Sequence, residues 1–218
     1  MTSKYFSHKN SLSEAAKNDP TKESNGDYWY LNTKEYPPFV WVDNVFTKEE
    51  LDRIIIIGER VSKQRAGTQG QGEECLDMRR SMISWIPIND VTSWIYRRIT
   101  DVIVDNNNKF YNYDLTYLER LQFTYYDFKE RGCYHKHVDP LVWNLPHNRK
   151  LSFVMQLSDP DNYEGGELIL HTSEDPVVVD KKRGMIVIFP SYTLHEVTPV
   201  TSGERYSLVN WVHGPAFK

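Results

Sequence analysis

The sequence predicts one α+β domain with helices in its first half and about eight short strands in its second half. In two stretches before residue 107, apolar residues recur with the helical period, whereas after Tyr117 apolar residues recur at every second position. The first spacing places side chains along one face of a helix, and the second places them on one face of a strand. Helices followed by many short strands indicate a strand layer closed as a sandwich or barrel.

The size and composition are those of a globular domain. The chain has 218 residues, of which 39% are hydrophobic, 26% charged and 13% aromatic. This length is enough for one domain with a sizeable core. We expect the polar residues 1–27 to form a loosely ordered leader, and residues 28–218 to form the single domain.

Composition also argues against several classes of protein. The net charge of -4 gives no basis for nucleic-acid binding. The chain has no apolar run long enough for a membrane helix and no apolar stretch near its start that would act as a secretory signal. Its two cysteines, Cys75 and Cys133, are expected to be reduced thiols. We therefore expect a cytoplasmic protein without membrane or nucleic-acid partners.

Capping signals locate the helices. Thr47 and Glu50 have the spacing of a capping box before an apolar run, which predicts a helix over Thr47–Glu59. A second helix is predicted over Asn89–Asn106, with Asn89 or Asp90 as its cap.

The remaining segments are predicted to be strands and loops. Lys63–Asp77 contains three glycines and reads as a flexible loop, and Arg79–Ile86 follows it as a strand candidate. Further strands are predicted, with turn residues between them, at Phe39–Val42, Leu121–Tyr126, Leu151–Leu157, Glu167–His171, Val177–Val179, Met185–Phe189 and Arg205–Val212.

A metal site is indicated by His137 and Asp139. Residues two apart on a strand point to the same face. Two histidines and one carboxylate, with coordination positions left open, form the usual site for non-haem Fe(II) that activates oxygen. A third ligand must come from another strand. His195, which follows a strong strand ending at Pro190, is the first candidate, and His171 is its rival.

A candidate anion site lies ten residues beyond His195. Arg205, Ser207 and Trp211 share one face of a predicted strand. Arginine can grip a carboxylate through two hydrogen bonds, and a serine two residues along can add a third. A surface salt bridge is the alternative reading of Arg205.

In this order the motifs resemble those of Fe(II)- and 2-oxoglutarate-dependent oxygenases, and among them the prolyl 4-hydroxylase group. The resemblance covers roughly Arg79 to Trp211. Its pieces are Gln122-x-x-x-Tyr126, Gly132-x-Tyr134-x-x-His137-x-Asp139, Arg149-Lys-Leu-Ser-Phe-Val-Met-Gln-Leu157, Tyr163-Glu-Gly-Gly-Glu167-Leu, and Phe189-Pro190 through His195 to Gly203-x-Arg205-Tyr-Ser207-x-x-x-Trp211.

The resemblance implies a double-stranded β-helix (a jelly-roll or cupin-like fold) with the two helices packed on one sheet. It also implies Fe(II) as the metal and 2-oxoglutarate and O2 as co-substrates, with ascorbate as the reductant. The implied roles are iron binding by His137, Asp139 and His195; 2-oxoglutarate binding by Arg205, Tyr126 and Ser207; and substrate binding by Tyr134 and Trp211. The segment between Tyr126 and Gly132 is about two residues longer than is usual in the family, so Arg205 is the firmer assignment.

The implied reaction converts 2-oxoglutarate to succinate and CO2 and hydroxylates an unactivated C–H bond. We expect a proline residue of a peptide or protein as substrate, with Lys63–Asp77 as a lid. Arg79 and Arg80 could donate to peptide carbonyls, or could form a solvated strand end.

Three alternatives remain open at this stage. The same chemistry could act on a free amino acid, a lysyl residue or a small metabolite. A nucleic-acid demethylase fits less well, because the chain is not basic. The alternative from another class is a non-catalytic β-helix that binds a ligand. The motifs leave the target, the position of hydroxylation and the oligomeric state open.

Overall fold

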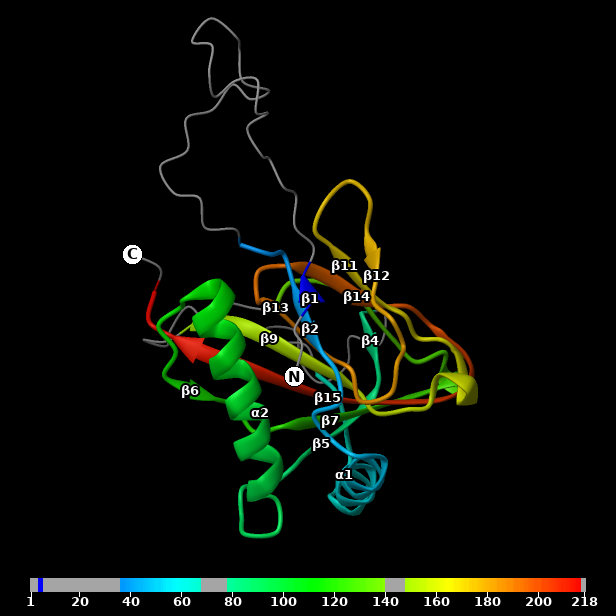
Figure 1. Ribbon diagram of the computed structural model, residues 1–218. Coiled ribbons are helices and arrows are strands. Elements are labelled where there is room, and N and C mark those ends of the chain that lie inside the picture. The colour runs from blue at the N-terminus through cyan, green and yellow to red at the C-terminus, as the bar shows by residue number, and fades with distance from the viewer. Residues whose placement is uncertain (1–3, 6–35, 68–77, 140–147, 217–218) are drawn as a thin grey trace, which may run out of the picture.

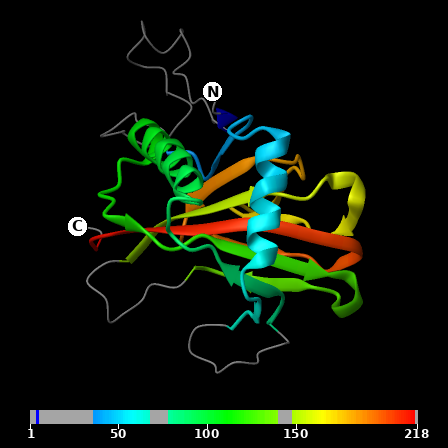
Figure 2. The same cartoon turned by 90° about the horizontal axis from the view of Figure 1, so that it is seen from below.

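The computed structural model describes residues 4–5, 36–67, 78–139 and 148–216. Two antiparallel sheets face each other, and two helices cover the outer face of the larger sheet (Figures 1 and 2). This is a double-stranded β-helix, and it confirms the predicted fold class.

In the described part of the chain the larger sheet has ten strands. Its main path runs in the order β1 (Lys4–Tyr5), β2 (Val40–Val42), β13 (Ile186–Pro190), β9 (Asn148–Gln156), β15 (Val200–Gly214), β7 (Gln122–Asp127), β5 (Met82–Trp85) and β3 (Gln64–Arg65), while β6 (Tyr117–Leu118) and β10 (Tyr163–Gly165) also pair with β15. The long strand β15 is therefore the centre of this sheet.

The smaller sheet has five strands, in the order β12 (Val177–Val178), β11 (Leu168–His171), β14 (Leu194–Val197), β8 (Cys133–His137) and β4 (Arg79–Arg80). Alternate residues of the larger sheet face this sheet or the helices. On β9, for example, Phe153 and Met155 join the core under the helices, whereas Val154 joins the core between the sheets. The alternation read from the sequence thus directs neighbouring residues of one strand into two different cores.

Helix α1 (Lys48–Arg60) begins where the sequence predicts. Thr47 is its N-cap, and the capping box with Glu50 is complete. Its buried residues Leu51 and Ile54 pack in the core on the larger sheet. This core also contains Ile95 and Ile99 of α2, the second helix (Ser93–Asn106), so both helices pack on one sheet as predicted.

The bounds predicted for α2 were partly wrong. The side chain of Asn89 accepts hydrogen bonds from the backbone of Val91 and Thr92, which holds a turn ahead of the helix. The helix therefore begins after Thr92 instead of at Asn89. At its other end the α-helix stops at Asn106, as predicted. The chain then continues as a π-helical turn (Asn107–Tyr111) that ends at Asn112 with φ 53°.

The single strand predicted over Arg79–Ile86 is in fact two strands in different sheets. Arg79 and Arg80 form β4, which pairs with β8 in the smaller sheet, whereas β5 pairs with β7 in the larger sheet. The chain crosses between the sheets at Ser81. This crossing places Arg79 next to Tyr134, its partner across the strand pair.

Two predicted segments lie mostly outside the described residues. Of the leader, only Lys4–Tyr5 is described, as a strand paired with β2. Of the lid, only residues 63–67 are described, and they include β3. No described helix is both long and apolar enough to cross a bilayer. Cys133 is buried and free, and Cys75 lies outside the described residues.

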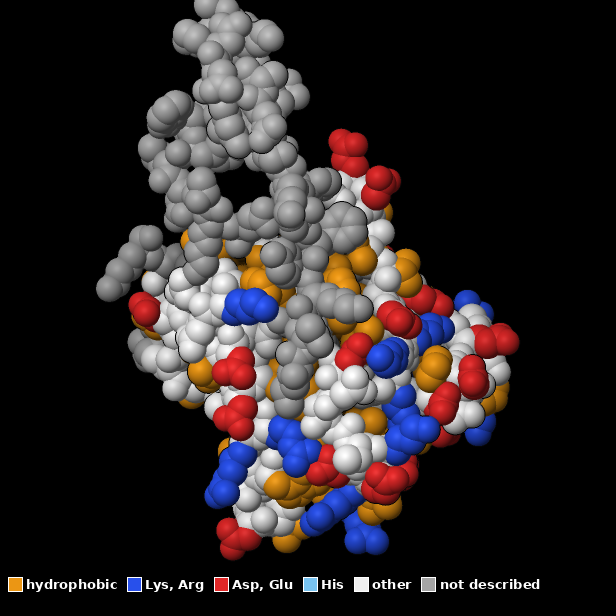
Figure 3. Space-filling view, viewed as in Figure 1, with side chains coloured by type: hydrophobic (Ala, Val, Ile, Leu, Met, Phe, Trp, Pro, Cys, Tyr) orange, Lys and Arg blue, Asp and Glu red, His pale blue; other side chains and the backbone are white. Residues whose placement is uncertain are grey.

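Charges of both signs are interspersed on the face seen in Figure 3, without an extended region of one sign. Some of them pair on the surface, such as Lys182 with Asp43 at 2.9 Å. This face offers no continuous basic surface to a nucleic-acid backbone.

Gly58 provides a test of how closely α1 packs on the larger sheet. A Cβ atom there would lie 2.3 Å from the ring of Phe123. We expect Gly58→Ala to lower the free energy of unfolding by about 1–3 kcal/mol, because overpacking outweighs the better helix propensity of alanine. Urea denaturation would measure this change in the free energy of unfolding. Gly67→Ala is the control, because no atom of the described residues lies within 4 Å of its Cβ position. An increased free energy of unfolding in Gly58→Ala would contradict the close packing of α1 on Phe123.

Candidate active site

Three side chains converge between the two sheets. His137 ends β8, Asp139 follows two residues later, and His195 lies on β14 directly opposite His137. Nε2 of His137 is 4.0 Å from Oδ1 of Asp139, and Nε2 of His195 is 3.8 Å from Oδ2 of Asp139. All three ligand atoms lie within 4.8 Å of one another, which makes this set a candidate site for one metal ion.

Backbone carbonyls orient both imidazoles. Nδ1 of His137 lies 2.7 Å from the carbonyl oxygen of His135, and Nδ1 of His195 lies 2.9 Å from that of Thr193. An Nδ1–H that donates to a carbonyl leaves the lone pair of Nε2 free to bind a metal. Burial, followed by the adjacent His195, lowers the pKa of His137 to about 3, so that this imidazole is neutral near pH 7.

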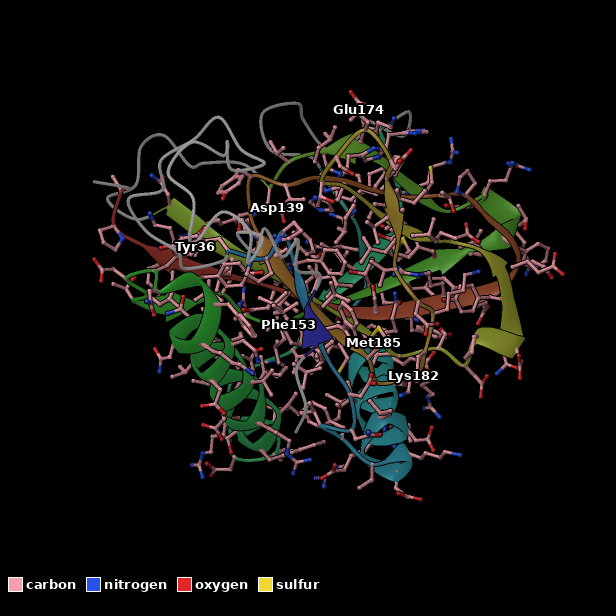
Figure 4. All side chains as sticks on the ribbon, turned by 45° about the horizontal axis from the view of Figure 1, so that its top comes forward. Tyr36, Asp139, Phe153, Glu174, Lys182 and Met185 are labelled. Carbon is pink, nitrogen blue, oxygen red and sulfur yellow. The ribbon has the colours of Figure 1, made fainter. Side chains whose placement is uncertain are left out.

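The carboxylate of Asp139 is held by the larger sheet. Ser152 of β9 donates to its Oδ2 and also lies 3.0 Å from the hydroxyl of Ser191. The backbone N–H of Asp139 donates to the carbonyl of Ser191 at 3.0 Å. Figure 4 shows Asp139 on the side of the sheet away from the two helices. The contact from Ser152 therefore links the metal-site carboxylate of one sheet to the other sheet.

The rival ligand His171 lies on the opposite face of the smaller sheet. Leu170, not His171, is the residue of β11 that pairs with His195, so His171 points the other way. Its Nε2 contacts Glu196 at 2.9 Å. His213 is likewise engaged with Glu119 at 2.7 Å, and His147 lies outside the described residues. The structure thus brings His195, and not these histidines, to His137 and Asp139.

Arg205 is almost completely buried, at 1% exposure, and lines the same pocket. Its guanidinium donates to the hydroxyl of Ser207 at 3.3 Å and to the side-chain oxygen of Gln156 at 3.0 Å, and it lies over the ring of Tyr126. Among the described residues no carboxylate lies within ion-pair distance of it. A buried guanidinium without a counter-charge is costly, so this site is suited to an anion.

Two further polar groups beside Arg205 were not assigned a role from the sequence. The hydroxyl of Tyr163, Nε2 of Gln156 and Nε of Arg205 are buried and have no hydrogen-bond partner among the described residues. These groups supply unused donors near a positive charge, which matches the oxygens of a carboxylate. Gln156 could have been found from the strand pattern, because it shares a strand face with Ser152.

Gly166, just before β11, makes room for Arg205. It has φ +64°, and a Cβ atom there would lie 2.8 Å from Cδ of Arg205. A larger residue would be strained in its backbone and would displace the arginine side chain. This close approach gives a physical reason for Gly166 in the motif.

Tyr134 and Arg79 form the wall of the pocket beside His137. The ring of Tyr134 stacks on the imidazole of His137 with 3.5 Å between centroids, and the guanidinium of Arg79 lies 4.5 Å from the centroid of the Tyr134 ring. Both residues line the pocket, as does Gln122 of β7. The sequence-predicted Arg80 is not among the lining residues, and donates instead to the carbonyl of Arg131 at 3.3 Å.

Trp211 also lines the pocket, and a charged network holds it from behind. The guanidinium of Arg149 lies 3.9 Å from the centroid of its ring. Glu119 accepts two hydrogen bonds from Arg149, at 2.6 and 2.9 Å. Burial would raise the pKa of Glu119, but hydrogen bonds from His213 and Arg149 more than offset this, and the pKa is lowered. Glu119 is thus a charged partner that neutralises Arg149.

Residues 121–213 match the sequence model of the family described as the 2OG-Fe(II) oxygenase superfamily, where 2OG stands for 2-oxoglutarate. This segment contains all three residues of the candidate metal site and Arg205. By this match, residues 121–213 are similar to the 2OG-Fe(II) oxygenase superfamily.

Curated proteins that are similar to part of this chain carry the name PKHD-type hydroxylase. One from Teredinibacter turnerae is 38% identical over 89 residues, and one from a Synechococcus strain is 51% identical over 65 residues. The first alignment covers 39% of each chain, and the second covers 29% of each. The similarity therefore spans well under half the length of these relatives.

Solved structures share the fold over most of the chain. A prolyl-4-hydroxylase from Pseudomonas putida superposes with a TM-score of 0.66 over 82% of this chain and 94% of its own, at 18% identity. A prolyl hydroxylase from Trichoplax adhaerens, in complex with a hypoxia-inducible-factor peptide fragment, gives 0.65 over 80% and 83%, also at 18% identity. At this identity the likeness shows the fold, the double-stranded β-helix of 2-oxoglutarate oxygenases.

The donor set fits Fe(II). Two imidazoles from adjacent strands and the carboxylate of Asp139 leave coordination positions open, which is the arrangement of non-haem Fe(II) oxygenases. The unused donors around Arg205 fit the distal carboxylate of 2-oxoglutarate. The residues present therefore fit the metal and the co-substrate that the superfamily implies.

The contact from Ser152 to Asp139 gives a testable prediction. We expect Ser152→Ala to weaken Fe(II) binding by roughly 10–100-fold, as loss of a partner of a metal ligand commonly does. Calorimetric titration of metal under argon would measure this.

Ser84→Ala is the matched control for Ser152→Ala. Ser84 is a buried serine of the larger sheet that donates to the carbonyl of Gly58 at 2.7 Å, away from the site. It should affect stability and leave metal affinity unchanged. Equal affinity losses in the two variants would contradict a specific role for Ser152.

Proposed function

We propose that this protein is an Fe(II)- and 2-oxoglutarate-dependent dioxygenase that hydroxylates proline residues of a peptide or protein, with release of succinate and CO2. The observation that carries the dioxygenase proposal is the buried Arg205, which shares a pocket with His137, Asp139 and His195. No carboxylate of the described residues pairs with it. A non-catalytic β-helix that only binds a ligand gives no reason to place a metal triad and a buried guanidinium in one cavity. A dioxygenase that binds both Fe(II) and 2-oxoglutarate needs both.

Each residue has a defined task in this proposal. His137, Asp139 and His195 would hold Fe(II), which, when bound with 2-oxoglutarate and O2, supplies the oxidation of a C–H bond. Arg205 and Ser207 would bind the distal carboxylate, with Tyr126, Tyr163 and Gln156 around it. The apolar walls from both sheets, such as Val154 and Leu168, would exclude water from this end of the pocket.

Several observations support a prolyl substrate. The relatives named PKHD-type hydroxylases and the solved prolyl hydroxylases share the motifs or the fold, and one of those structures holds a peptide fragment. In this chain Tyr134 and Trp211 offer flat ring surfaces at the metal side of the pocket, which suit a pyrrolidine ring. Ascorbate is proposed as the reductant that keeps the iron in the Fe(II) state.

Arg205 and His137 should be separable by their effects on the two ligands. We expect Arg205→Gln to weaken 2-oxoglutarate binding at least about tenfold, because a charged hydrogen bond contributes about 1.5–3 kcal/mol, while Fe(II) binding is retained. His137→Ala should instead abolish metal binding and turnover without unfolding the chain. Calorimetric titrations of each ligand, with circular dichroism for folding, would measure both. Unchanged 2-oxoglutarate affinity in Arg205→Gln would contradict the assignment.

The substrate class can be tested by comparing free proline with peptides. With Fe(II), ascorbate and 2-oxoglutarate present, proline-containing peptides should stimulate succinate release, and mass spectrometry should find one added oxygen on proline. Turnover of free proline with none on any peptide would overturn the peptidyl substrate and leave the iron site intact. Absence of succinate under every condition would overturn the dioxygenase proposal itself.

A further inference from the structure

The pocket contains a second buried arginine for which neither the metal nor 2-oxoglutarate gives a role. Arg79 on β4 is 7% exposed and lines the same cavity as Arg205. It lies on the metal side, next to Tyr134, whereas Arg205 belongs to β15 of the facing sheet. The two guanidiniums therefore serve different parts of the pocket.

Neutral groups hold Arg79 in place. Its Nε donates to the hydroxyl of Ser81 at 2.8 Å, and its Nη2 donates to Oε1 of Gln122 at 2.8 Å. One face of the guanidinium lies over the ring of Tyr134. These contacts use one edge and one face of the group, and no described residue accepts a hydrogen bond from Nη1. The side chain is thus oriented by the protein while some of its donors are unused.

Arg79 lacks the charge partner that a comparable arginine has. Arg149 is also buried, at 8% exposure, and Glu119 neutralises it through two hydrogen bonds. Among the described residues no carboxylate lies within ion-pair distance of Arg79. An ordered, desolvated guanidinium that no described carboxylate compensates is suited to binding an anion.

Charge counting indicates that the anion belongs to the substrate. Fe(II) and the two arginines would contribute four positive charges to the pocket, and Asp139 and 2-oxoglutarate together would contribute three negative charges. Among these described groups, one positive charge therefore remains when the metal and co-substrate are bound. A carboxylate that enters with the substrate would neutralise it at Arg79, one aromatic ring away from the metal ligand His137.

We propose that Arg79 binds a carboxylate of the substrate and so makes this enzyme selective for acidic substrates. The inference rests on the proposed function and narrows its substrate class. The carboxylate can come from an acidic residue near the hydroxylated proline or from a free chain end. Both present the same planar pair of oxygens to a guanidinium.

The test uses a panel of probe peptides with Fe(II) and 2-oxoglutarate. The parent is the capped pentapeptide Ala-Ala-Pro-Ala-Ala. Each flanking position is replaced in turn by Glu or by Gln, and one version, like free proline, has an uncapped carboxylate. Binding is measured by calorimetry under argon, and succinate release is measured in air. We expect at least one acidic probe to bind at least about tenfold more tightly than its neutral counterpart.

Substitution of Arg79 should remove this preference. In Arg79→Gln the ratio of affinities between acidic and neutral probes should fall towards one, and Arg79→Lys should retain part of it. The ratio is the informative quantity, because general damage to the pocket would weaken both probes equally. Arg80→Gln is the matched control, since the side chain of Arg80 contacts the carbonyl of Arg131 outside the pocket, and the ratio should not change.

The outcomes separate the two proposals. If the acidic probe is the Glu peptide, the carboxylate is a side chain; if it is the uncapped peptide or free proline, it is a chain end. Equal binding of acidic and neutral probes by the unsubstituted enzyme, or a preference that survives in Arg79→Gln, overturns the role of Arg79. In those cases succinate release still reports on the dioxygenase. Should Arg79→Gln not fold, the Glu-to-Gln comparison on the unsubstituted enzyme decides.

Discussion

The register between β8 and β14 is the constraint on which the site depends. It places His195 directly opposite His137, so that both imidazoles point between the sheets. Because side chains alternate along a strand, a slip of one residue would turn His195 outward and bring Leu194 or Glu196 to its place. The arrangement of His171 shows this alternation, since it lies one residue from the partner of His195 and points away from the site.

An irregularity in the same pair of strands builds the rest of the metal side. His195 pairs with His137 and Val197 pairs with Tyr134, so two steps on β14 match three steps on β8. A regular strand would put residues three apart on opposite faces, whereas this bulge brings Tyr134 and His137 to the same pocket. Arg79 follows, because it is the partner of Tyr134 across β4 and β8. One extra residue in β8 thus places Tyr134 in the wall of the pocket, with Arg79 beside it.

The two sheets have complementary electrostatic roles. The smaller sheet carries His137 and His195, and Asp139 follows its strand β8. The larger sheet carries Arg205 together with Ser152, which holds Asp139. Helices α1 and α2 pack on the other face of the larger sheet and support it without entering the site. The same strands, β9 and β15, therefore supply core residues on one face and polar pocket residues on the other. Movement of one sheet against the other would alter metal and co-substrate binding together.

The sequence by itself determined the elements and the chemical groups that are set by local patterns. The capping box fixed the start of α1, and the period of two located the strands of the second half. His137 and Asp139 are kept close to each other by their separation of two residues. The same alternation predicted that Arg205 and Ser207 share one face of a strand. Local hydrogen bonds and periodicity decide these features, and both are written in neighbouring residues.

Only the tertiary structure decided what depends on pairing between distant segments. The choice of His195 over His171 required the register of β14, and the split at Ser81 and the bulge in β8 required both sheets. The roles of Gln156, Tyr163 and Ser152 depended on which groups meet across the pocket. The difference between Arg79 and Arg80 arose in the same way: the two arginines are adjacent in sequence, but alternation on β4 buries one beside Tyr134 and directs the other to Arg131. Burial and the absence of a counter-charge among the described residues are properties of the folded surroundings, and these properties make Arg79 a binding group.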